Sequence, residues 1–597
     1  MTSLIDFSDP HDAAAPRLRH AFGAPRRVLA AYAHDELHGL LEAAEQAARA
    51  GAWVLGWVAY EAAPAFDAAL TTHPPEAGWP LAWFGVHDAP LSWPQAPPEE
   101  DARAEWSAAM ARAQFDAAHG RVQQDIAQGR YYQVNLTAPL HGRLAGSPRA
   151  LFAQLQRAQP GGYAAYVDAG AGQRVLSVSP ELFFDWRAGA DGEGELLTRP
   201  MKGTAARGAS AQEDQALRAQ LAASAKERAE NVMIVDLLRN DVSRVAQPHS
   251  VRVSRLFHTE ALASVWQMTS DVRATTRTGT RLAELFAALF PCGSVTGAPK
   301  REAMRAIRAL ESGPRGVYCG ALGLLRPDPA RGAGAIAATF NVPIRTLLQD
   351  GAALRCGIGS GLVWGAQADA EWREWEAKRR FVLRASEPFE ILETLGLAQG
   401  SYRHLDAHLA RMRASAAYFG HPWDDAALAR ALDALARAHA DGAWRVRLLL
   451  DARGRYGAEA APLVPTPTPV RLALATRPFP DAHGEFTRHK TTRRAQYAAF
   501  APTPGSGVFD TLLYNDAGEL TETTFGSIAA YVDGCWITPA LSCGLLPGVG
   551  RARLLEQGRL REGVLRLADL PRVQDWAFIN SLRGWLPARL QPPTAAP

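Results

Sequence analysis

The sequence predicts a multidomain α+β protein, on three observations. The chain has 597 residues, more than a single hydrophobic core normally serves. Helical segments alternate with short strand-like runs between residues 106 and 384, which is typical of a large mixed domain. A charged helical segment at 371–384 is followed by Ala385-Ser386-Glu387-Pro388, after which a new pattern begins. We therefore place a domain boundary at this point.

The elements that we expect follow one another in a simple order. A helix at 36–50 and a strand at 53–60 belong to a first lobe, which ends in a proline-rich loop. Beyond the boundary, a strand and a helix open a rear unit, and a Pro/Gly loop divides that unit into two lobes. The front comprises residues 1–105 and 106–384, with the proline-rich loop at 90–98. The rear lobes are about 385–478 and 484–597, with the Pro/Gly loop at 476–484. The rear strand is expected at 389–394 and the rear helix at 404–418.

The composition excludes several classes of protein. The chain is 47% hydrophobic and 21% charged, as in a soluble globular protein, and its 64 basic and 61 acidic residues leave a net charge of +3. Such a balance gives no case for binding nucleic acid or a membrane surface. Five cysteines without a C-x-x-C pair argue against a zinc site and a disulfide framework. With neither a signal peptide nor a membrane-spanning stretch visible, we expect a cytoplasmic protein.

Two pairs of carboxylates first suggest chemistry. Glu227 and Glu230 are three residues apart in a helical segment, and Glu371 and Glu374 repeat this spacing. On a helix this spacing puts both carboxylates on one face. Two such faces opposed across a cleft would form a hard oxygen site suited to Mg²⁺. From spacing alone, solvated helix surfaces with arginine partners are the favoured interpretation, because glutamate pairs on helices are common.

The surrounding motifs change this weighting, because many of them agree in order and spacing with one family. The motifs are Tyr132-Gln133-Val134-Asn135-Leu136, Ser179-Pro180-Glu181, Pro200-Met201-Lys202-Gly203-Thr204, Asp236-Leu237-Leu238-Arg239-Asn240-Asp241, Gly293-Ser294-Val295-Thr296-Gly297-Ala298-Pro299-Lys300, Ile344-Arg345-Thr346 and Gly357-Ile358-Gly359-Ser360-Gly361. With these motifs, the chain resembles the chorismate-utilising enzymes between about residues 110 and 384, a family that includes anthranilate, isochorismate, salicylate and aminodeoxychorismate synthases.

The resemblance implies a role for each matching residue. Glu230 and Glu374 match direct Mg²⁺ ligands, and Glu227 and Glu371 match carboxylates that hold metal-bound water. Arg345 matches the residue that grips the enolpyruvyl carboxylate of chorismate. Glu181 matches the general acid that protonates the departing C4 hydroxyl, for which it needs a raised pKa. The further expected substrate-binding residues are Gln267, Tyr318, Thr296, Gly359 and Lys378.

Lys202 discriminates between members of the family. Anthranilate synthases resemble this chain but carry alanine here, whereas aminodeoxychorismate synthases carry lysine. The resemblance implies that Lys202 attacks C2 as the 4-hydroxyl leaves and that ammonia arriving at C4 displaces it. This route needs a neutral amine, through desolvation or cationic neighbours. A surface salt-bridge partner is the usual role of a lysine, and inside this motif we disfavour it.

Two further features bear on the front reaction. Gln267 stands where relatives commonly have histidine. An amide can hydrogen-bond substrate but cannot shuttle protons, so it is compatible with chemistry that stops at the aminated, non-aromatic product. No glutaminase elbow of the form G-x-C-x-G is visible in the sequence. Ammonia therefore comes either from free solution or from a separate glutamine amidotransferase subunit.

The rear unit resembles the class IV, branched-chain-aminotransferase-like pyridoxal-phosphate fold over roughly residues 389–590. The resemblance implies that Arg411 binds the cofactor phosphate, that Lys490 is the Schiff-base lysine and that Glu522 pairs with the pyridine nitrogen. The matching motifs are His408-Leu409-Ala410-Arg411-Met412, His489-Lys490-Thr491, Leu520-Thr521-Glu522-Thr523-Thr524, Gly544-Leu545-Leu546-Pro547-Gly548-Val549-Gly550-Arg551 and Asn580-Ser581-Leu582-Arg583-Gly584.

The phosphate loop of this unit supplies Val549 and Gly550, and relatives often have threonine in place of Gly550. Class IV includes aminotransferases as well as aminodeoxychorismate lyases, and the motifs separate them poorly. The resemblance also admits a homodimer formed through the rear unit.

Together the two halves predict a bifunctional enzyme of folate biosynthesis. The front would aminate chorismate at C4 with Mg²⁺, and the rear would use pyridoxal 5′-phosphate to eliminate pyruvate and leave 4-aminobenzoate. An anthranilate-type enzyme fused to an aminotransferase is the first alternative, against which Lys202 and Gln267 argue. A regulatory or scaffold protein with decayed sites is the second, against which the two intact carboxylate pairs argue, together with Lys202, Glu181, Lys490 and Glu522.

Overall fold

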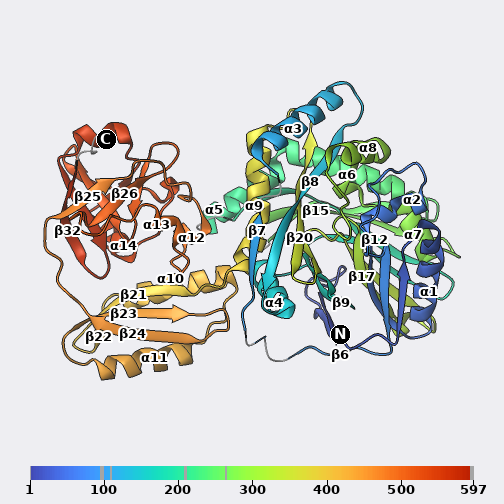
Figure 1. The fold of residues 1–597 in the computed structure, drawn as a ribbon, viewed down its shortest axis with the longest axis horizontal. Coiled ribbons are helices and arrows are strands. Elements are labelled where there is room, and N and C mark those ends of the chain that lie inside the picture. Colours follow the sequence, from blue (N-terminus) through green and yellow to red (C-terminus); the bar gives the residue numbers. More distant parts are fainter. Residues whose placement is uncertain are drawn as a thin grey trace. The chain divides into compact units, whose positions relative to one another are not determined.

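The chain folds into two compact units that divide between Pro388 and Phe389 (Figure 1). The structure is a computed structural model that describes residues 2–94, 98, 100–107, 110–207, 211–261 and 265–591. Its mixture of helices and sheets confirms the predicted multidomain α+β class. Within the described ranges, no helix combines the length and the apolar character that crossing a bilayer requires.

The first unit is built on two large antiparallel sheets. The first sheet runs in the order β16 (Gly297–Ala298), β8 (Gln133–Ala145), β20 (Ala353–Val363), β19 (Thr346–Asp350), β10 (Gln173–Ser179), β9 (Tyr163–Gly170), β1 (Ser3–Phe7), β2 (Leu18–Phe22), β6 (Leu91–Ser92), with β7 (Arg103–Ser107) paired to β8. The second runs in the order β13 (Met201–Ala206), β15 (Val265–Thr275), β12 (Gly194–Arg199), β11 (Leu182–Ala188), β18 (Ile336–Asn341), β17 (Ala321–Pro327), β4 (Trp53–Val58), β5 (Ala82–His87), β3 (Arg27–Ala31), with β14 (Arg252–Ala261) paired to β15.

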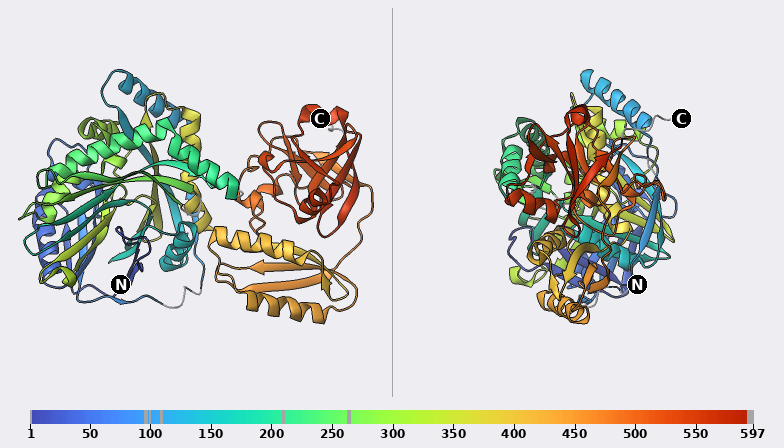
Figure 2. Two further views of the ribbon diagram at one scale, coloured as in Figure 1. Left: turned by 180° about the vertical axis from the view of Figure 1, so that it is seen from behind. Right: turned by 90° about the vertical axis from the view of Figure 1, so that its left-hand side faces the viewer.

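Helices cover the outer faces of both sheets, and the inner faces pack against each other. Residues such as Phe7 and Val175 of the first sheet meet Trp57 and Leu324 of the second in one buried cluster. The first sheet is covered by α3 (Arg112–Ala127), α4 (Pro148–Ala158), α8 (Lys300–Leu310) and α9 (Ala368–Ser386). The second is covered by α1 (Leu37–Arg49), α2 (Ala63–Phe66), α6 (Ala225–Ser243) and α7 (Leu282–Leu289). Figure 2 shows α5 (Ala211–Ala223) and α6 following one another along the second sheet.

The first 105 residues do not form a lobe of their own. Their predicted helix and strand are present as α1 and β4, but β1 to β7 are distributed over the same two sheets as the rest of the unit. Non-local strand pairing of this kind leaves no mark in a local sequence pattern. Of the predicted loop at 90–98, β6 forms a short strand, and residues 95–97 lie outside the described residues.

The second unit has two lobes, each with its own sheet. The smaller sheet has the order β22 (Ser401–Tyr402), β21 (Ile391–Ala398), β23 (Ala443–Leu450), β24 (Tyr456–Pro462), and it packs against α10 (Leu405–Phe419) and α11 (Asp425–Ala438). The larger has the order β27 (Leu520–Thr523), β26 (Asp510–Tyr514), β25 (Val470–Leu474), β32 (Gly584–Leu590), β31 (Asp575–Asn580), β28 (Ser527–Val532), β29 (Cys535–Pro539), β30 (Arg561–Gly563). Its helices are α12 (Glu485–Arg488), α13 (Ala495–Ala498) and α14 (Val549–Glu556).

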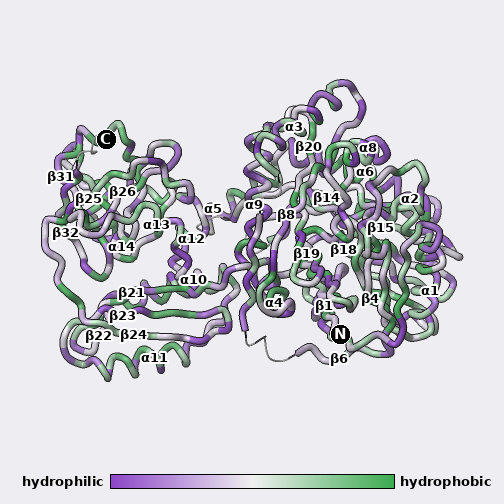
Figure 3. The backbone as a smooth tube through the Cα atoms, viewed as in Figure 1, coloured by the Kyte–Doolittle hydropathy of each residue, from purple (hydrophilic) through white to green (hydrophobic). Residues whose placement is uncertain are grey.

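The division between these lobes lies earlier than the sequence predicts. Strand β25 pairs in parallel with β26 and β32, so it already belongs to the larger sheet. The connection between the lobes is therefore the proline-rich segment 463–469, not the loop at 476–484. The rear strand and helix are present as β21 and α10. Around α11, apolar and polar residues alternate (Figure 3), and its buried Leu428 and Leu432 face the small sheet.

Candidate functional site

One face of β20 carries three glycines in succession and brings together residues from several motifs. Gly357, Gly359 and Gly361 alternate with the buried Ile358, Ser360 and Leu362. A β-carbon on Gly361 would lie 2.6 Å from Lys202 Nζ and 2.4 Å from Gln133 Nε2. One on Gly357 would lie 2.3 Å from the ring of Tyr318. Lys202 of β13 and Gln133 of β8 thus lie together over Gly361 of β20, and Tyr318 lies over Gly357, four residues away along the strand.

The Lys202 side chain is surrounded by acidic groups. Its positive charge acts to lower the pKa of Glu181, Glu227, Glu230 and Glu374. Among the described residues, the charged neighbours identified in this way are carboxylates, whereas the sequence led us to expect desolvation or cationic neighbours. The structure therefore assembles Lys202 with the general-acid candidate and with members of both carboxylate pairs.

Gln267 secures the strand that carries Lys202. Its Nε2 donates to the carbonyl of Gly203 at 2.9 Å, and its Oε1 accepts from the hydroxyl of Thr204 at 3.0 Å. Thr204 is also its partner in the register between β13 and β15. Both ends of this amide are thus used within the protein, although the sequence led us to expect it to bind substrate.

The two carboxylate pairs lie on α6 and α9 and interact electrostatically. Burial, with the charge of Glu374 and other groups, raises the pKa of Glu227, Glu230 and Glu371. Burial acts to raise the pKa of Glu374 as well, but Lys378, whose Nζ is 2.7 Å away, brings it below its ordinary value. Because the carboxylate of Glu374 on α9 affects the pKa of Glu227 and Glu230 on α6, the helix faces that carry these carboxylates lie near each other.

The side chains of Glu227, Glu230, Glu371 and Glu374, which we call the acidic quartet, do not converge on a single point. In the described ranges, no three His, Cys, Asp or Glu side chains are close enough together to hold a metal ion as they stand. The donor set, four carboxylates that disfavour one another's ionised form, nevertheless suits a hard divalent cation. Neighbours fix two of the carboxylates: Ser360 donates to Glu371 at 2.6 Å, and Lys378 also donates to the carbonyl of Gly359 at 2.9 Å.

Glu181 has the environment that a general acid requires. Burial raises its pKa to about 7, against the opposing effects of the Ser294 hydroxyl and the Lys202 charge. Its Oε1 is buried and has no hydrogen-bond partner among the described residues. A carboxyl group in this state holds a proton near neutral pH and can deliver it to a bound molecule.

Arg345 occupies a strained backbone position. Its φ of 51° lies in the left-handed region, which costs a non-glycine residue about 1–3 kcal/mol. Burial and the nearby charge of Arg384 lower its pKa to about 10, and its guanidinium donates to the side chain of Gln159.

Thr296, which we expected to bind substrate, uses its hydroxyl within the protein, donating to the carbonyl of Cys292 at 3.1 Å.

The sequence motifs contain two residues whose importance only the fold reveals. Gln133 has no exposed surface, and neither its Nε2 nor its Oε1 finds a partner in the described structure. A buried amide without partners is costly, so the free donor and acceptor of this group next to Lys202 are suited to bind a polar ligand. Ser294, buried in the turn at Gly293–Val295, faces the carboxyl of Glu181. Both stand in motifs quoted above, but nothing in the sequence distinguishes them from their neighbours.

The second unit contains a cavity of about 540 Å³ around Lys490. Burial and the charges of Arg411 and Arg494 lower the pKa of Lys490 to about 8, which favours a nucleophilic amine. The backbone carbonyl of Lys490 accepts from Leu392 N at 2.9 Å, so β21 fixes its place. Burial raises the pKa of Glu522, which lines the same cavity, to about 7. Tyr497 Oη donates to its carboxylate at 2.8 Å.

Arg411 is held at the edge of this cavity by a buried carboxylate. Its Nε and Nη2 donate to Glu393 at 2.8 and 2.7 Å, and its Nη1 donates to the carbonyl of Pro547 at 2.9 Å. Burial acts to raise the pKa of Glu393, but Arg411 and His408 lower it to about 2. The ion pair therefore fixes the guanidinium beside the loop that leads into α14.

The start of α14 explains the glycine at position 550. A β-carbon there would lie 2.8 Å from the backbone carbon of Asn580 and 2.9 Å from Ser581 N. A threonine would collide with backbone, so the glycine permits close approach of the two loops. With Val549 at the first helical position, the free backbone N–H groups of this helix face a cation-rich cavity. The lysine, the carboxylate, the arginine and the helix start together fit pyridoxal phosphate.

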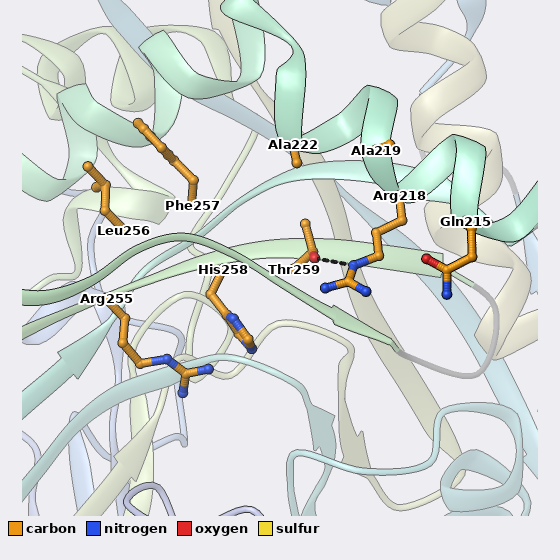
Figure 4. A pocket seen from close by; sticks show the side chains of 9 residues that line it. All are labelled: Gln215, Arg218, Ala219, Ala222, Arg255, Leu256, Phe257, His258 and Thr259. Atoms are coloured by element: carbon orange, nitrogen blue, oxygen red, sulfur yellow. Dashed lines mark hydrogen bonds between the residues drawn. The ribbon is translucent and has the colours of Figure 1, made fainter.

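A cavity of about 530 Å³ in the first unit involves none of the expected site residues. It lies between α5 and β14, and Figure 4 shows Arg218, Arg255 and His258 around it. Arg218 Nε donates to the hydroxyl of Thr259 at 2.9 Å. Burial and the Arg255 charge lower the pKa of His258. The cavity is polar and basic, and it lies outside the site around Lys202.

Comparisons with known proteins agree with this geometry. Residues 12–384 match the family described as chorismate binding enzyme, and residues 390–590 match class IV aminotransferases. The chain is 36% identical over 296 residues to aminodeoxychorismate synthase component 1 of Klebsiella aerogenes, covering 49% of this chain and 61% of that protein. It is 42% identical over 256 residues to aminodeoxychorismate synthase of Streptomyces pristinaespiralis, covering 42% and 34%. The chain thus spans less than two thirds of the length of these curated relatives.

A solved structure shares the fold of the first unit. Anthranilate synthase component I from Streptococcus pneumoniae TIGR4 superimposes with a TM-score of 0.50 at 21% identity, covering 64% of this chain and 90% of that one.

Proposed function

The chain belongs to the chorismate-binding enzyme family, with a class IV aminotransferase domain behind it, and from this we propose that it makes 4-aminobenzoate in two steps. The first unit would aminate chorismate at C4 to 4-amino-4-deoxychorismate. The second would eliminate pyruvate from that product. The observation that carries the proposal is the meeting of Lys202 Nζ with the glycine face of β20, among the carboxylates of Glu181 and the acidic quartet.

In the first unit, binding and proton transfer fall to different residues. Glu230 and Glu374 would hold Mg²⁺ directly, with Glu227 and Glu371 behind bound water. The ion, when bound, supplies charge neutralisation for the ring carboxylate of chorismate. Arg345 would bind the enolpyruvyl carboxylate through its planar fork.

The amination itself needs an acid and a nucleophile. Glu181, protonated near neutral pH, gives its proton to the C4 hydroxyl, which leaves as water. Lys202 Nζ, after its ammonium proton has passed to a neighbouring carboxylate, forms a bond to C2 as the ring double bonds shift and the C4–O bond breaks. Ammonia then bonds to C4, the double bonds shift back, and the Lys202 amine is released.

In the second unit, Lys490 would hold pyridoxal phosphate covalently, with Arg411 and the start of α14 on the phosphate and Glu522 on the pyridine nitrogen. The cofactor, when bound, supplies an electron sink. Lys490 would also serve as the base that removes the proton from C4. Breaking of the C3–O bond would then make the ring aromatic, and the enolpyruvyl group would take up that proton and leave as pyruvate.

The source of ammonia and the surroundings of the enzyme belong to the same proposal. We infer that ammonia comes from free solution or from a separate glutamine amidotransferase. A homodimer through the second unit and a place in the cytoplasm also remain proposals. The five cysteines are all unpaired, which supports a reducing compartment.

The test is a product assay on the full chain. Chorismate, ammonia, Mg²⁺ and pyridoxal phosphate should yield 4-aminobenzoate and pyruvate in equal amounts. Anthranilate as the main product would overturn the proposal for the first unit. Accumulation of 4-amino-4-deoxychorismate without pyruvate would overturn it for the second.

A further inference from the structure

The cavity around Lys490 carries more positive charge than the cofactor needs. Among the described residues that line it, seven are lysines or arginines and one is a carboxylate, Glu522. Part of this charge is already used. Arg411 is paired with Glu393, and Arg551 donates to Glu562 and to the carbonyl of Pro539. Arg494 lies over the ring of Tyr497, 4.4 Å from its centre, and its charge acts on the carboxylate of Glu522.

Three arginines of the lining remain: Arg445, Arg447 and Arg583. Arg445 and Arg447 alternate along β23 with Val446 and Leu448, which are buried under the helices of the smaller lobe. The arginines therefore project from the opposite face of the sheet, into the cavity. In the register, Arg447 lies opposite Thr394 on β21 and Glu459 on β24, and Arg445 lies opposite Gly396 and Ala461. Glu459 is therefore the one charged residue directly opposite either arginine in these two strands, and it forms no ion pair with Arg447 in the described structure.

Arg583 reaches the same region from the larger lobe. Its Nε donates to the hydroxyl of Thr466 at 2.9 Å, which fixes the side chain. Arg583 and Arg445 line the same cavity, and burial together with the charge of Arg445 lowers the pKa of Arg583. Within the described part of the chain, none of the three arginines forms an ion pair. Cations gathered in this way repel one another, and a bound anion relieves that repulsion.

We propose that Arg445, Arg447 and Arg583 bind the two carboxylates of a dianionic substrate in the cavity of the second unit. This inference rests on the proposed function, whose intermediate carries one carboxylate on the ring and a second on the enolpyruvyl group. Each guanidinium offers a planar pair of donors that matches one carboxylate. An ordinary amino acid with a single α-carboxylate would leave part of this surface unmatched, so the arginines select for the dianion.

The test supplies 4-amino-4-deoxychorismate directly to the full chain loaded with pyridoxal phosphate. Arg445→Gln, Arg447→Gln and Arg583→Gln should each raise KM about 10-fold or more, because each removes a charge-assisted hydrogen bond. The cofactor absorbance should stay as in the unsubstituted enzyme. Arg447→Lys should recover part of the loss, since it keeps the charge without the fork. Arg430→Gln, on the exposed side of α11, is the matched control and should leave KM unchanged.

A second measurement needs no substituted protein. Benzene-1,3-dicarboxylate should inhibit the unsubstituted enzyme at least about 10-fold more strongly than benzoate, and added salt should reduce this preference. Unchanged KM values in all three glutamine variants, or equal inhibition by the two acids, would overturn the role of the arginines. If 4-amino-4-deoxychorismate is not consumed at all, the proposed reaction fails, while the inhibitor preference still decides separately whether the cavity selects dianions.

Discussion

At the scale of single residues, Glu181 ties the proposed chemistry to pH. Because its pKa is raised to about 7, the carboxyl is protonated below that pH and ionised above it. An acid catalyst acts in its protonated form, so at a fixed concentration of free NH₃ the amination of chorismate should slow as pH rises through about 7. Glu181→Gln should lower the rate about 10²–10⁴-fold. Amination is measured in a Lys490→Ala background, so that the second reaction does not contribute.

A second buried glutamate provides the control for this prediction. The pKa of Glu61 is also raised to about 7 by burial, but its carboxylate accepts hydrogen bonds from the backbone N–H groups of Arg315 and Gly316. Glu61→Gln should leave the pH profile of amination unchanged. A profile that keeps its decline above pH 7 in the Glu181→Gln variant would assign the acid to another group.

Substitution of Gln133 should affect the rate of amination and the stability of the fold differently. Its amide is buried with both ends unpaired, so Gln133→Leu removes a cost and should leave the free energy of unfolding equal or raise it by about 1–3 kcal/mol. Amination should nevertheless fall at least about 10-fold, because the amide lies beside Lys202 Nζ. Urea unfolding and the rate of chorismate consumption measure the two effects.

The matched substitution is Gln154→Leu in α4. This amide is also buried, but it accepts from Ala102 N at 2.7 Å and donates to the carbonyls of Ala102 and Ala385. Its loss should destabilise the first unit and leave the site around Lys202 intact. If Gln133→Leu destabilises the protein as much as Gln154→Leu does, the amide of Gln133 has a structural role instead.

At the scale of elements, β20 contains glycines that serve two different purposes. A β-carbon on Gly361 would meet the mobile ends of Lys202 and Gln133, whereas one on Gly359 would meet the carbonyl oxygen of Leu136 at 2.3 Å. Gly361→Ala should therefore reduce amination with little loss of stability. Gly359→Ala should disturb the pairing of β20 with β8 and lower the unfolding midpoint. Chorismate consumption and thermal unfolding distinguish the two.

A helical glycine serves as the reference for these substitutions. Gly39 lies in α1, and a β-carbon there would have no neighbour within 4 Å. Gly39→Ala should leave the activity unchanged and stabilise the helix by about 1 kcal/mol. Full activity in Gly361→Ala would contradict the placement of Lys202 over this strand.

The elements differ in how well sequence predicts them, and the difference has a physical basis. Helices α6 and α9 were predictable with their carboxylates on one face, because helical spacing is local. The membership of β25 in the larger sheet was not, because its parallel partners β26 and β32 are distant in sequence. The same limit applies to Gln133. Whether a buried amide has partners depends on strands that pair only in the folded chain.

At the scale of the whole molecule, the two units have separate hydrophobic cores. Clusters around Phe7, Phe115 and Phe286 belong to the first, and those around Leu472 and Val446 belong to the second. Lys202 and Lys490 lie in different units, and each is set in its own network of contacts. We therefore expect substitutions at one lysine to leave the chemistry of the other unit intact.

This independence predicts the behaviour of a mixture of two inactive proteins. Lys202→Ala should lose amination but still convert supplied 4-amino-4-deoxychorismate, and Lys490→Ala should aminate chorismate but release no pyruvate. Mixed together with chorismate, ammonia, Mg²⁺ and pyridoxal phosphate, the two variants should restore 4-aminobenzoate. The intermediate then has to diffuse between molecules, so its formation should show a lag that shortens as protein concentration rises. Each variant alone is the control. A mixture that makes no product, while each variant retains its remaining reaction, would show that the intermediate does not reach solution.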